Sequence, residues 1–214
     1  GSLLGEVRLG IPGRHNATNA LAVIALARHL GADFARLAEA LGRFEGARRR
    51  FETIYSDSDF RIVDDYGHHP TEIAATLAAA RESGAKRIMV LFQPHRYTRT
   101  AALREEFGDA LAGADALAVT SIYAASETPL PGVTGELIAE AAREAGCARV
   151  VHEPDLRKMA AVHGPSLEPG DLVLTLGAGN IHEAGKTLAR FLSLRKELAS
   201  VMGPGNIRVF EPLS

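Results

Sequence analysis

Apolar and polar positions alternate with two different periods along this chain. Between residues 16 and 42, small and aliphatic residues return every three or four positions, which predicts two helices separated at Gly31, with Asp33 capping the second. Residues 3–11 alternate loosely and predict an edge strand or half of a hairpin. From residue 51 onward, short apolar runs alternate with helical stretches, which is the pattern of an α/β protein.

The second part of the chain predicts a sheet with helices packed on it. Strands are expected at residues 51–55, 60–64, 87–92, 116–121, 149–152 and 172–176. Helices are expected near residues 71–83, 99–112, 134–145, 155–163 and 180–200. The last four strands are short, apolar and rich in β-branched residues, as parallel strands are when helices cover both faces. We therefore expect a Rossmann-like, doubly wound and mostly parallel sheet, preceded by an α-helical segment.

A change of pattern near the basic run at residues 48–50 divides the chain. Two helices and one strand bury too little apolar surface for a core, so residues 1–46 are expected to be the end of a domain that begins upstream. Residues 47–197 are expected to form the α/β domain. Residues 198–214 contain the turn-forming run Gly203-Pro204-Gly205 and are expected to be a linker followed by a short extended piece.

The bulk composition narrows the class of protein. With 46% hydrophobic and 23% charged residues, the chain of 214 residues is typical of a soluble globular protein. Its net charge of -2 gives no field that favours nucleic acid or an anionic membrane, and no apolar run reaches the roughly 20 residues of a membrane helix. The single cysteine, Cys147, excludes an internal disulfide and is expected to be a packed side chain in a reducing, cytoplasmic compartment.

Polar side chains gather where predicted strands end. The four stretches concerned are residues 64–69, 93–99, 123–127 and 177–180. Because ligands of open parallel sheets bind outside the carboxyl ends of the strands, we expect these stretches to form one site.

Individual members of these stretches also have ordinary structural explanations. Asp65 fits a cap of the following helix as well as a catalytic carboxylate. His68 and His69 fit solvated side chains as well as imidazoles that move a proton near neutral pH. A metal site made by these histidines and His95 is a further alternative, but their spacing does not favour zinc, and we predict no metal ligand. The glycines at residues 177–179 fit a phosphate loop and a tight strand–helix turn equally well.

Two arginines point to an anionic ligand. Arg96 and Arg99 are spaced to face the same way at a helix start, where the helix dipole also favours a carboxylate or phosphate. Asn16 and Asn19 lie three residues apart at another helix start, so both amides can face one ligand, or Asn16 simply caps that helix. Arg50 lies at the predicted domain boundary, where it is either a hinge residue that reaches the site or a surface charge.

Five motifs occur together along the chain. They are Gly-Arg-His-Asn-x-x-Asn at 13–19, Gly-Ala-Arg-Arg-Arg-Phe-Glu at 46–52, Asp-Asp-Tyr-Gly-His-His-Pro-Thr-Glu at 64–72, Phe-Gln-Pro-His-Arg-Tyr-Thr-Arg-Thr at 92–100 and Gly-Ala-Gly-Asn-Ile at 177–181. In this order and spacing they resemble the Mur ligases, the ATP-dependent amide-forming enzymes of peptidoglycan precursor synthesis. The likeness covers about residues 4–195 and is closest to the members that join L-alanine to UDP-N-acetylmuramate. The alternatives are the members that attach a tripeptide to the same sugar nucleotide, and a Rossmann-like nucleotide-binding module without chemistry.

The resemblance implies a fold and an activity. The family has a UDP-sugar domain, a central ATPase domain and a C-terminal Rossmann-like domain that brings the amino acid, so residues 1–46 would end the second and residues 47–197 would form the third. In the full enzyme ATP, with Mg2+, phosphorylates the muramoyl carboxylate, and the amine of L-alanine attacks the acyl phosphate. The resemblance places this reaction in the cytoplasm, as a step of the cell-wall biogenesis that supports cell shape and division. Because this chain lacks the glycine-rich P-loop, we expect it to be inactive by itself.

The resemblance also implies roles for individual residues. Catalysis would involve His68, Arg96 and Asp65. L-alanine would be held by Tyr66, His68, His69, His95, Arg96 and Arg99. ATP would be bound by Asn16, Asn19, Arg50 and Asp65.

The last residues carry a second, shorter resemblance. Residues 206–214 are similar to the opening of UDP-N-acetylenolpyruvoylglucosamine reductase, a flavoenzyme of the same pathway. This would make the chain part of a ligase–reductase fusion and would add FAD as a cofactor of the downstream part. An ordinary tail is the alternative.

Overall fold

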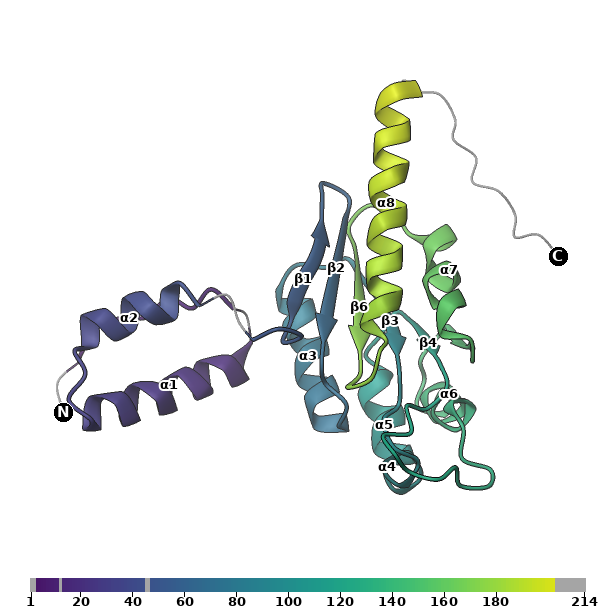
Figure 1. Cartoon of the computed structure of the whole chain (residues 1–214), viewed down its shortest axis with the longest axis horizontal. Helices are drawn as coiled ribbons and strands as arrows, with labels where there is room; N and C mark the ends of the chain where they lie inside the picture. The colour runs from purple at the N-terminus through teal and green to yellow at the C-terminus, as the bar shows by residue number, and fades with distance from the viewer. Residues whose placement is uncertain (1–2, 12, 45–46, 203–214) are drawn as a thin grey trace.

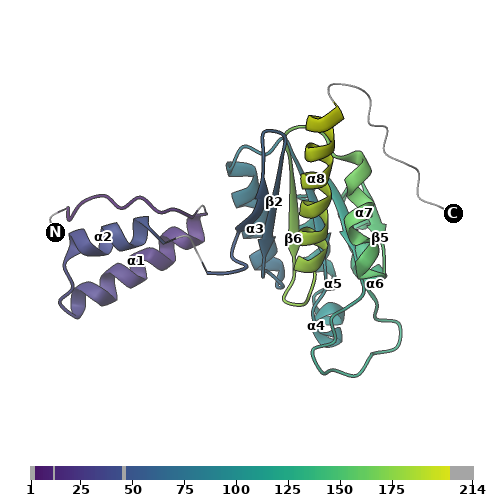
Figure 2. The ribbon, with the colours of Figure 1, turned by 45° about the horizontal axis from the view of Figure 1, so that its top comes forward.

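The computed structural model describes residues 3–11, 13–44 and 47–202. It contains a pair of helices, α1 (Arg14–His29) and α2 (Phe34–Gly42), that lies to one side of a larger α/β body. Figures 1 and 2 show the two parts joined through the segment that leads to strand β1. The chain passes from one part to the other in the segment between α2 and β1.

A six-stranded sheet forms the centre of the larger body, in the order β1-β2-β6-β3-β4-β5. The strands are β1 (Glu52–Ser56), β2 (Phe60–Asp65), β3 (Arg87–Phe92), β4 (Ala116–Val119), β5 (Val150–His152) and β6 (Asp171–Leu176). Only β1 runs antiparallel to its neighbour, as the partner of β2 in a hairpin; the other pairs are parallel. The mostly parallel α/β sheet predicted from the alternating pattern is confirmed.

Helices cover both faces of this sheet, as a doubly wound fold requires (Figures 1 and 2). They are α3 (Pro70–Glu82), α4 (Tyr97–Ala102), α5 (Arg104–Leu111), α6 (Gly135–Glu144), α7 (Met159–His163) and α8 (His182–Met202), with short 3-10 turns at Leu156–Lys158 and Gly164–Ser166. One face packs against α3, α5 and α6, and the other against α7 and α8.

Neighbouring residues of one strand serve the two cores in turn. Val63 of β2 faces the α3 side, whereas Ile62 faces the α8 side, and both are fully buried. In β3, Val90 and Leu91 divide in the same way. The alternation follows from the pleat of the strand, and because both faces are covered the run is apolar throughout. Cys147 is buried in the α3-side core, so the prediction that it is a packed residue is confirmed.

Three sequence-based assignments of elements were wrong. Residues 3–11 form no strand; they run beside α2, with Gly5 against the ring of Phe34 and Gly10 against the backbone carbonyl of Phe44. The helix expected at 99–112 is two helices, because the backbone leaves helical geometry at Leu103 (φ -118°). The helix expected at 155–163 begins as a 3-10 turn and is helical only from Met159.

Of the caps predicted for the first two helices, the cap of α2 is present and the cap of α1 is not. Asp33 caps α2 by accepting a hydrogen bond from the backbone N–H of Arg36 at 3.0 Å, as expected. Asn16 does not cap α1, because Gly13 occupies the cap position and Asn16 lies within the first turn.

No helix in the described ranges combines the length and the apolar character that a membrane span requires. The reductase-like stretch at residues 206–214 lies outside the described residues.

Candidate functional site at the carboxyl ends of the strands

The carboxyl ends of β2, β6, β3 and β4 lie side by side, because these four strands are consecutive in the sheet and all parallel. The convergence of polar stretches predicted from the sequence is therefore confirmed. We call this edge, made by residues 64–69, 93–99, 120–127 and 177–180, the rim.

Arg49 ties the start of the larger body to two strand ends of the rim. Its Nε donates to Oδ2 of the buried Asp64 at 2.9 Å, and its Nη1 and Nη2 donate to the backbone carbonyls of Gly179 and Gly177 at 2.9 and 2.5 Å. Asp64 also accepts from the hydroxyl of Thr175 on β6 at 2.6 Å. The guanidinium thereby neutralises a buried carboxylate and fixes the glycine loop after β6.

Asp65 organises the turn that follows β2. It is 6% exposed and accepts backbone N–H donors from Phe51 at 2.8 Å and from Gly67 at 2.7 Å, together with the hydroxyl of Thr76 at 3.3 Å. Burial raises the pKa of Asp65 above its ordinary range, although these hydrogen bonds and the positive charge of Arg50 oppose the shift. Asp65 does not cap the next helix, so that alternative was wrong.

The cap of α3 is His69. Its Nδ1 accepts the backbone N–H of Thr71 at 3.4 Å, and Glu72 returns to the backbone N–H of His69, which completes a capping box. Glu72 also accepts the backbone N–H of His68 at 3.0 Å. Burial would raise the pKa of Glu72, but the hydrogen bond from His68, the charge of its ring and the charge of Arg50 hold it below its ordinary range.

An aromatic row crosses the rim from β2 to β4. The rings of Tyr66 and His68 meet edge to face at 5.4 Å, those of His68 and His95 lie 5.5 Å apart, and His95 stacks on Tyr123 at 5.5 Å. The guanidinium groups of Arg49 and Arg50 lie over the ring of Tyr66, at 5.1 and 5.8 Å from its centre. The row thus begins at two cations and joins three of the predicted substrate residues.

The loop after β3 brings positive charge beside the row. Burial lowers the pKa of His95, and the charges of His68, Arg99 and Arg96 lower it further, so both arginines lie near this imidazole. Nδ1 of His95 and Nη1 of Arg99 are buried and have no hydrogen-bond partner within the described part of the chain. Arg96 holds a left-handed backbone (φ 73°) as it opens α4. Such a conformation is costly for a residue with a side chain and is typical of functional sites.

Glu127 is held at the start of α4. Its carboxylate accepts from the hydroxyl of Thr98 at 2.6 Å and from the backbone N–H of Thr98 at 3.0 Å, and these two bonds lower its pKa. Its negative charge raises the pKa of His95 and so opposes the effect of burial and of the neighbouring cations.

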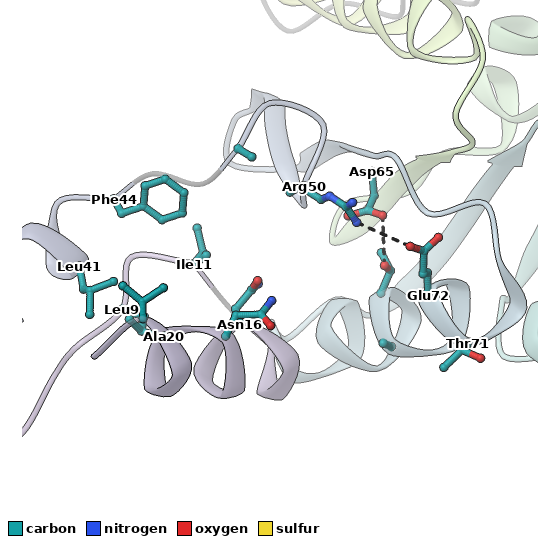
Figure 3. A pocket seen from close by; sticks show the side chains of 15 residues that line it. Leu9, Ile11, Asn16, Ala20, Leu41, Phe44, Arg50, Asp65, Thr71 and Glu72 are labelled. Atoms are coloured by element: carbon teal, nitrogen blue, oxygen red, sulfur yellow. Dashed lines mark hydrogen bonds and ion pairs between the residues drawn. The ribbon is translucent and has the colours of Figure 1, made fainter. Parts of the chain in front are cut away.

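A cavity of about 530 Å³ lies between the helix pair and the rim (Figure 3). Its walls include Asn16 and Asn19 of α1, Arg50 of the connecting segment, and Asp65 and Glu72 of the larger body. Arg50 and Glu72 approach to 3.9 Å across it. The remaining wall on the α1–α2 side is largely apolar. The four residues predicted to bind nucleotide therefore line one cavity that has both apolar and polar walls.

The predicted site residues thus fall into two neighbouring groups. Tyr66, His68 and His95 form the aromatic row with Arg96 and Arg99 beside it. Asn16, Asn19, Arg50 and Asp65 line the cavity. His69 makes its hydrogen bonds at the cap of α3. Within the described ranges, no three His, Cys, Asp or Glu side chains come together as metal ligands would.

Sequence reasoning assigned no individual role to four residues that lie in the rim or contact it. Arg49 was indistinguishable from its neighbours in a run of three arginines. Glu72 carried a usable signal, because it stands three residues after its cap, as a capping box requires. Tyr123 and Gln93 had no signal beyond their place after a strand; Gln93 proves to be buried and to donate to Asn180 across the strand ends at 3.0 Å.

A family model described as "Mur ligase, glutamate ligase domain" matches residues 49–179, which is more than half of the chain. This chain belongs to the Mur ligase family. The family resemblance carried by the five motifs is confirmed, and the matched residues include all six strands of the sheet.

Curated relatives agree with this membership. The UDP-N-acetylmuramate–L-alanine ligase of Syntrophotalea carbinolica is 48% identical over 195 residues, which cover 91% of this Mur ligase chain and 43% of that protein. The protein of the same name from Solibacter usitatus is 50% identical over 183 residues, which cover 86% of this chain and 39% of that protein. The chain therefore spans about two fifths of the length of these relatives.

Solved structures confirm the fold class. The crystal structure of UDP-N-acetylmuramate-alanine ligase MurC from Thermotoga maritima matches with a TM-score of 0.76 and 33% identity, over 89% of this chain and 40% of that one. A murein peptide ligase from Psychrobacter arcticus matches with a TM-score of 0.61 and 23% identity, over 87% of this chain and 38% of that one, and so shows the shared fold alone.

Proposed function

We propose that this Mur ligase chain supplies the amino-acid-binding part of a ligase that joins L-alanine to UDP-N-acetylmuramate. The observation that carries the proposal is the rim, where an aromatic row of Tyr66, His68 and His95 lies beside Arg96 and Arg99. The 48% identity to a relative named for that reaction supports the choice of substrate. The activity belongs to a protein of the relatives' length.

The division of labour follows the two parts of the molecule. We infer that residues 1–46 belong to the central ATP-binding domain and residues 47–197 form the C-terminal domain, which agrees with a family match at residues 49–179. A reductase segment within residues 198–214, and FAD with it, stays a prediction.

Arg96 and Arg99 are proposed to hold the carboxylate of L-alanine. An arginine can offer two parallel N–H donors to a carboxylate. Nη1 of Arg99 is buried and has no acceptor within the described residues, so it can donate to a bound carboxylate. The left-handed backbone of Arg96 costs conformational free energy. A role of Arg96 in binding a ligand would explain why the fold keeps this conformation. Charge pairing at this point would orient the amine toward the acyl phosphate.

His68 is proposed to take the proton that the attacking amine must lose. Its Nδ1 lies 3.1 Å from the backbone carbonyl of Tyr66, which only accepts, so Nδ1 carries the proton of the neutral ring and Nε2 keeps its lone pair. Glu72 lies 3.4 Å from the same Nδ1 and would stabilise the imidazolium once it forms.

The cavity between the two parts is the proposed nucleotide site. Asn16 and Asn19 would lie toward the adenine and ribose of ATP, with Arg50 toward its phosphates and Asp65 shaping the wall. Mg2+ would accompany the phosphates and be held mainly by residues that this chain lacks. Closing the cavity would exclude water from the acyl phosphate, which otherwise hydrolyses. The compartment is the cytoplasm and the process peptidoglycan synthesis.

The test is a chimera in which this chain follows the amino-terminal three fifths of the Syntrophotalea ligase. We expect it to release ADP from ATP only with UDP-N-acetylmuramate and L-alanine, whereas the chain alone releases none. Arg96→Met should lower kcat/KM for L-alanine by roughly a hundredfold, because a charged hydrogen-bond pair is lost in the transition state. Arg104→Met, which removes a guanidinium paired with Glu144 away from the rim, is the matched control.

Other results would point elsewhere. Faster turnover with a tripeptide than with L-alanine would identify the recycling type of Mur ligase. Nucleotide binding by a chimera that never turns over would indicate a module without chemistry. Full activity in both Arg96→Met and His68→Gln would remove the roles assigned to the rim.

A further inference from the structure

Tyr123 stands where three strand-end loops of the rim meet. Its backbone N–H donates to the carbonyl of Pro94 and its carbonyl accepts from the N–H of Arg96, both at 2.8 Å. These bonds make a short parallel bridge between Tyr123 and His95 beyond the ends of β3 and β4. The backbone of Tyr123 therefore fixes the position of the loop that ends at Arg96 and leads into α4, which carries Arg99.

The ring of Tyr123 repeats this connection with its side chain. It stacks on His95 at 5.5 Å between ring centres, with only 11° between the planes. Its other contact is with Gly179, where an added Cβ would lie 2.7 Å from Cγ of Tyr123 and would also collide with Oε1 of Gln93. Gly179 is thus needed for space, and the Tyr123 ring lies between the loops after β3 and β6.

The hydroxyl of Tyr123 makes no hydrogen bond within the described part of the chain, and the residue is 42% exposed. The contacts that tie it to the rim therefore belong to the ring and the backbone. Tyrosine and phenylalanine should be equivalent at this position, whereas an aliphatic residue should not.

The orientation of the His95 ring depends on this stacking, because few other contacts fix it. Its Nδ1 is buried without a partner in the described ranges, so no hydrogen bond at that atom fixes the imidazole plane. The charged groups that face it are Arg96 and Arg99 on its own loop, His68 across the row, and Glu127 on the loop of Tyr123. The Tyr123 ring stacked on one side fixes the orientation of this imidazole among them.

We propose that Tyr123 is a positioning residue that holds the His95 ring, and with it the Arg96–Arg99 loop, in the orientation that receives the amino acid. The inference rests on the proposed function for its ligand, but not for its geometry. Stacking fixes the plane of the His95 ring, and the paired backbone bonds hold the loop beside residue 123. Removal of the Tyr123 ring therefore releases the imidazole at the centre of this loop, while the backbone bonds stay in place.

The experiment uses the 214-residue chain and nitrogen-15 NMR of its histidine rings, with His95 assigned through His95→Gln. In Tyr123→Leu we expect the pKa of His95 to rise toward its ordinary 6.5 as water reaches the ring. Tyr123→Phe should reproduce the unsubstituted chain. Tyr55→Leu, the same change on edge strand β1, should leave His95 untouched. L-alanine, titrated into each chain, should bind roughly tenfold more weakly to Tyr123→Leu alone.

A second variant covers the case in which Tyr123→Leu does not fold. Gly179→Ala keeps the Tyr123 ring, but the added Cβ displaces it from its stacked position on His95, and we expect the same rise in the pKa of His95. An unchanged His95 in both variants, or a Tyr123→Phe chain that behaves like Tyr123→Leu, would overturn the proposal. If the unsubstituted chain gives no shift with L-alanine, the proposed substrate is in question, while the His95 measurements still decide the role of Tyr123.

Discussion

Arg49, rather than the neighbouring Arg50, is the arginine that holds the rim together. It binds a buried carboxylate and two carbonyls of the β6 loop, and it does so from a left-handed backbone (φ 59°). Arg50 faces the cavity, where it approaches Glu72. Two adjacent arginines therefore differ in role: Arg49 is structural, whereas Arg50 is placed where it can contact a ligand.

Arg49→Met should lower the free energy of unfolding by about 3 kcal/mol, because Asp64 would stay buried as an unpaired charge. Urea denaturation at pH 7 measures the loss. Adding Asp64→Asn should restore part of it, since the uncompensated charge is then gone. Arg43→Met, which breaks an exposed pair with Glu39, should change the value by less than about 0.5 kcal/mol. Equal losses at both arginines would contradict the assignment.

His163 of α7 should make the protein less stable in mild acid. It is 5% exposed, with Nε2 3.2 Å from the carbonyl of Val90, and burial lowers its pKa below the usual 6.5 although that carbonyl and Asp171 oppose the shift. The unfolded chain therefore takes up the proton first. Stability present above pH 6.5 is lost as the pH falls through 6.5 toward the lower folded-state pKa, by up to about 1.4 kcal/mol per pH unit.

Urea midpoints at pH 7.5, 6.5 and 5.5 measure this loss. His163→Gln, which can still donate to Val90 but cannot titrate, should show a shallower decline. The same substitution at the exposed His29 should leave the decline as it was. A decline that His163→Gln does not change would assign the effect to other groups; His95, with its own lowered pKa, acts in the same direction.

At the scale of elements, close contact between backbones decides how the helices pack. Gly108 lies where α5 crosses α6, and an added Cβ would be 2.6 Å from the carbonyl oxygen of Ala141. The Cβ is fixed to the backbone of α5 and the carbonyl oxygen belongs to the backbone of α6, so neither can rotate away and the two helices would have to separate.

Gly108→Ala should therefore lower the free energy of unfolding by about 2 kcal/mol, although alanine favours a helix by about 1 kcal/mol over glycine. Thermal or urea denaturation measures it. Gly113→Ala, where the nearest atom lies at an ordinary 3.6 Å, should change stability by no more than about 0.5 kcal/mol. A stabilised Gly108→Ala chain would mean that propensity outweighs packing at this crossing.

At the scale of the molecule, the α1–α2 pair contributes little to the core. Among the described residues of the two helices, Ala20 alone is a buried apolar residue, and several large apolar side chains of α1, including Leu21, Val23 and Leu26, are exposed. Both cores of the sheet are formed by residues from Phe51 onward. The pair forms a wall of the cavity but is not needed to bury the sheet.

A chain of residues 47–202 should accordingly unfold in one cooperative step at the urea midpoint of the whole protein. The physical reason is that both hydrophobic cores lie within it. Circular dichroism and tryptophan-free tyrosine fluorescence follow the transition. A midpoint lowered by more than the experimental error would show that the helix pair stabilises the body, and the domain division at residues 46 and 47 would then need revision.

Local chemistry was sufficient for much of this picture. Apolar periods predicted the alternating strands and helices, because a pleated strand and a helix repeat with different spacing whatever surrounds them. The polar stretches after four strands predicted the rim for the same local reason. The five motifs were sufficient to predict the family, which the family model confirms.

Only the tertiary structure decided which neighbours those stretches have. β6, the last strand in the chain, inserts between β2 and β3, and this order brings Gly177 and Gly179 to Arg49 and places Gly179 beneath Tyr123. Strand order and register are set by how distant apolar faces pack, and a local pattern does not contain that information. The same holds for the left-handed backbone at Arg49 and Arg96, which long-range contacts impose against the preference of the residue.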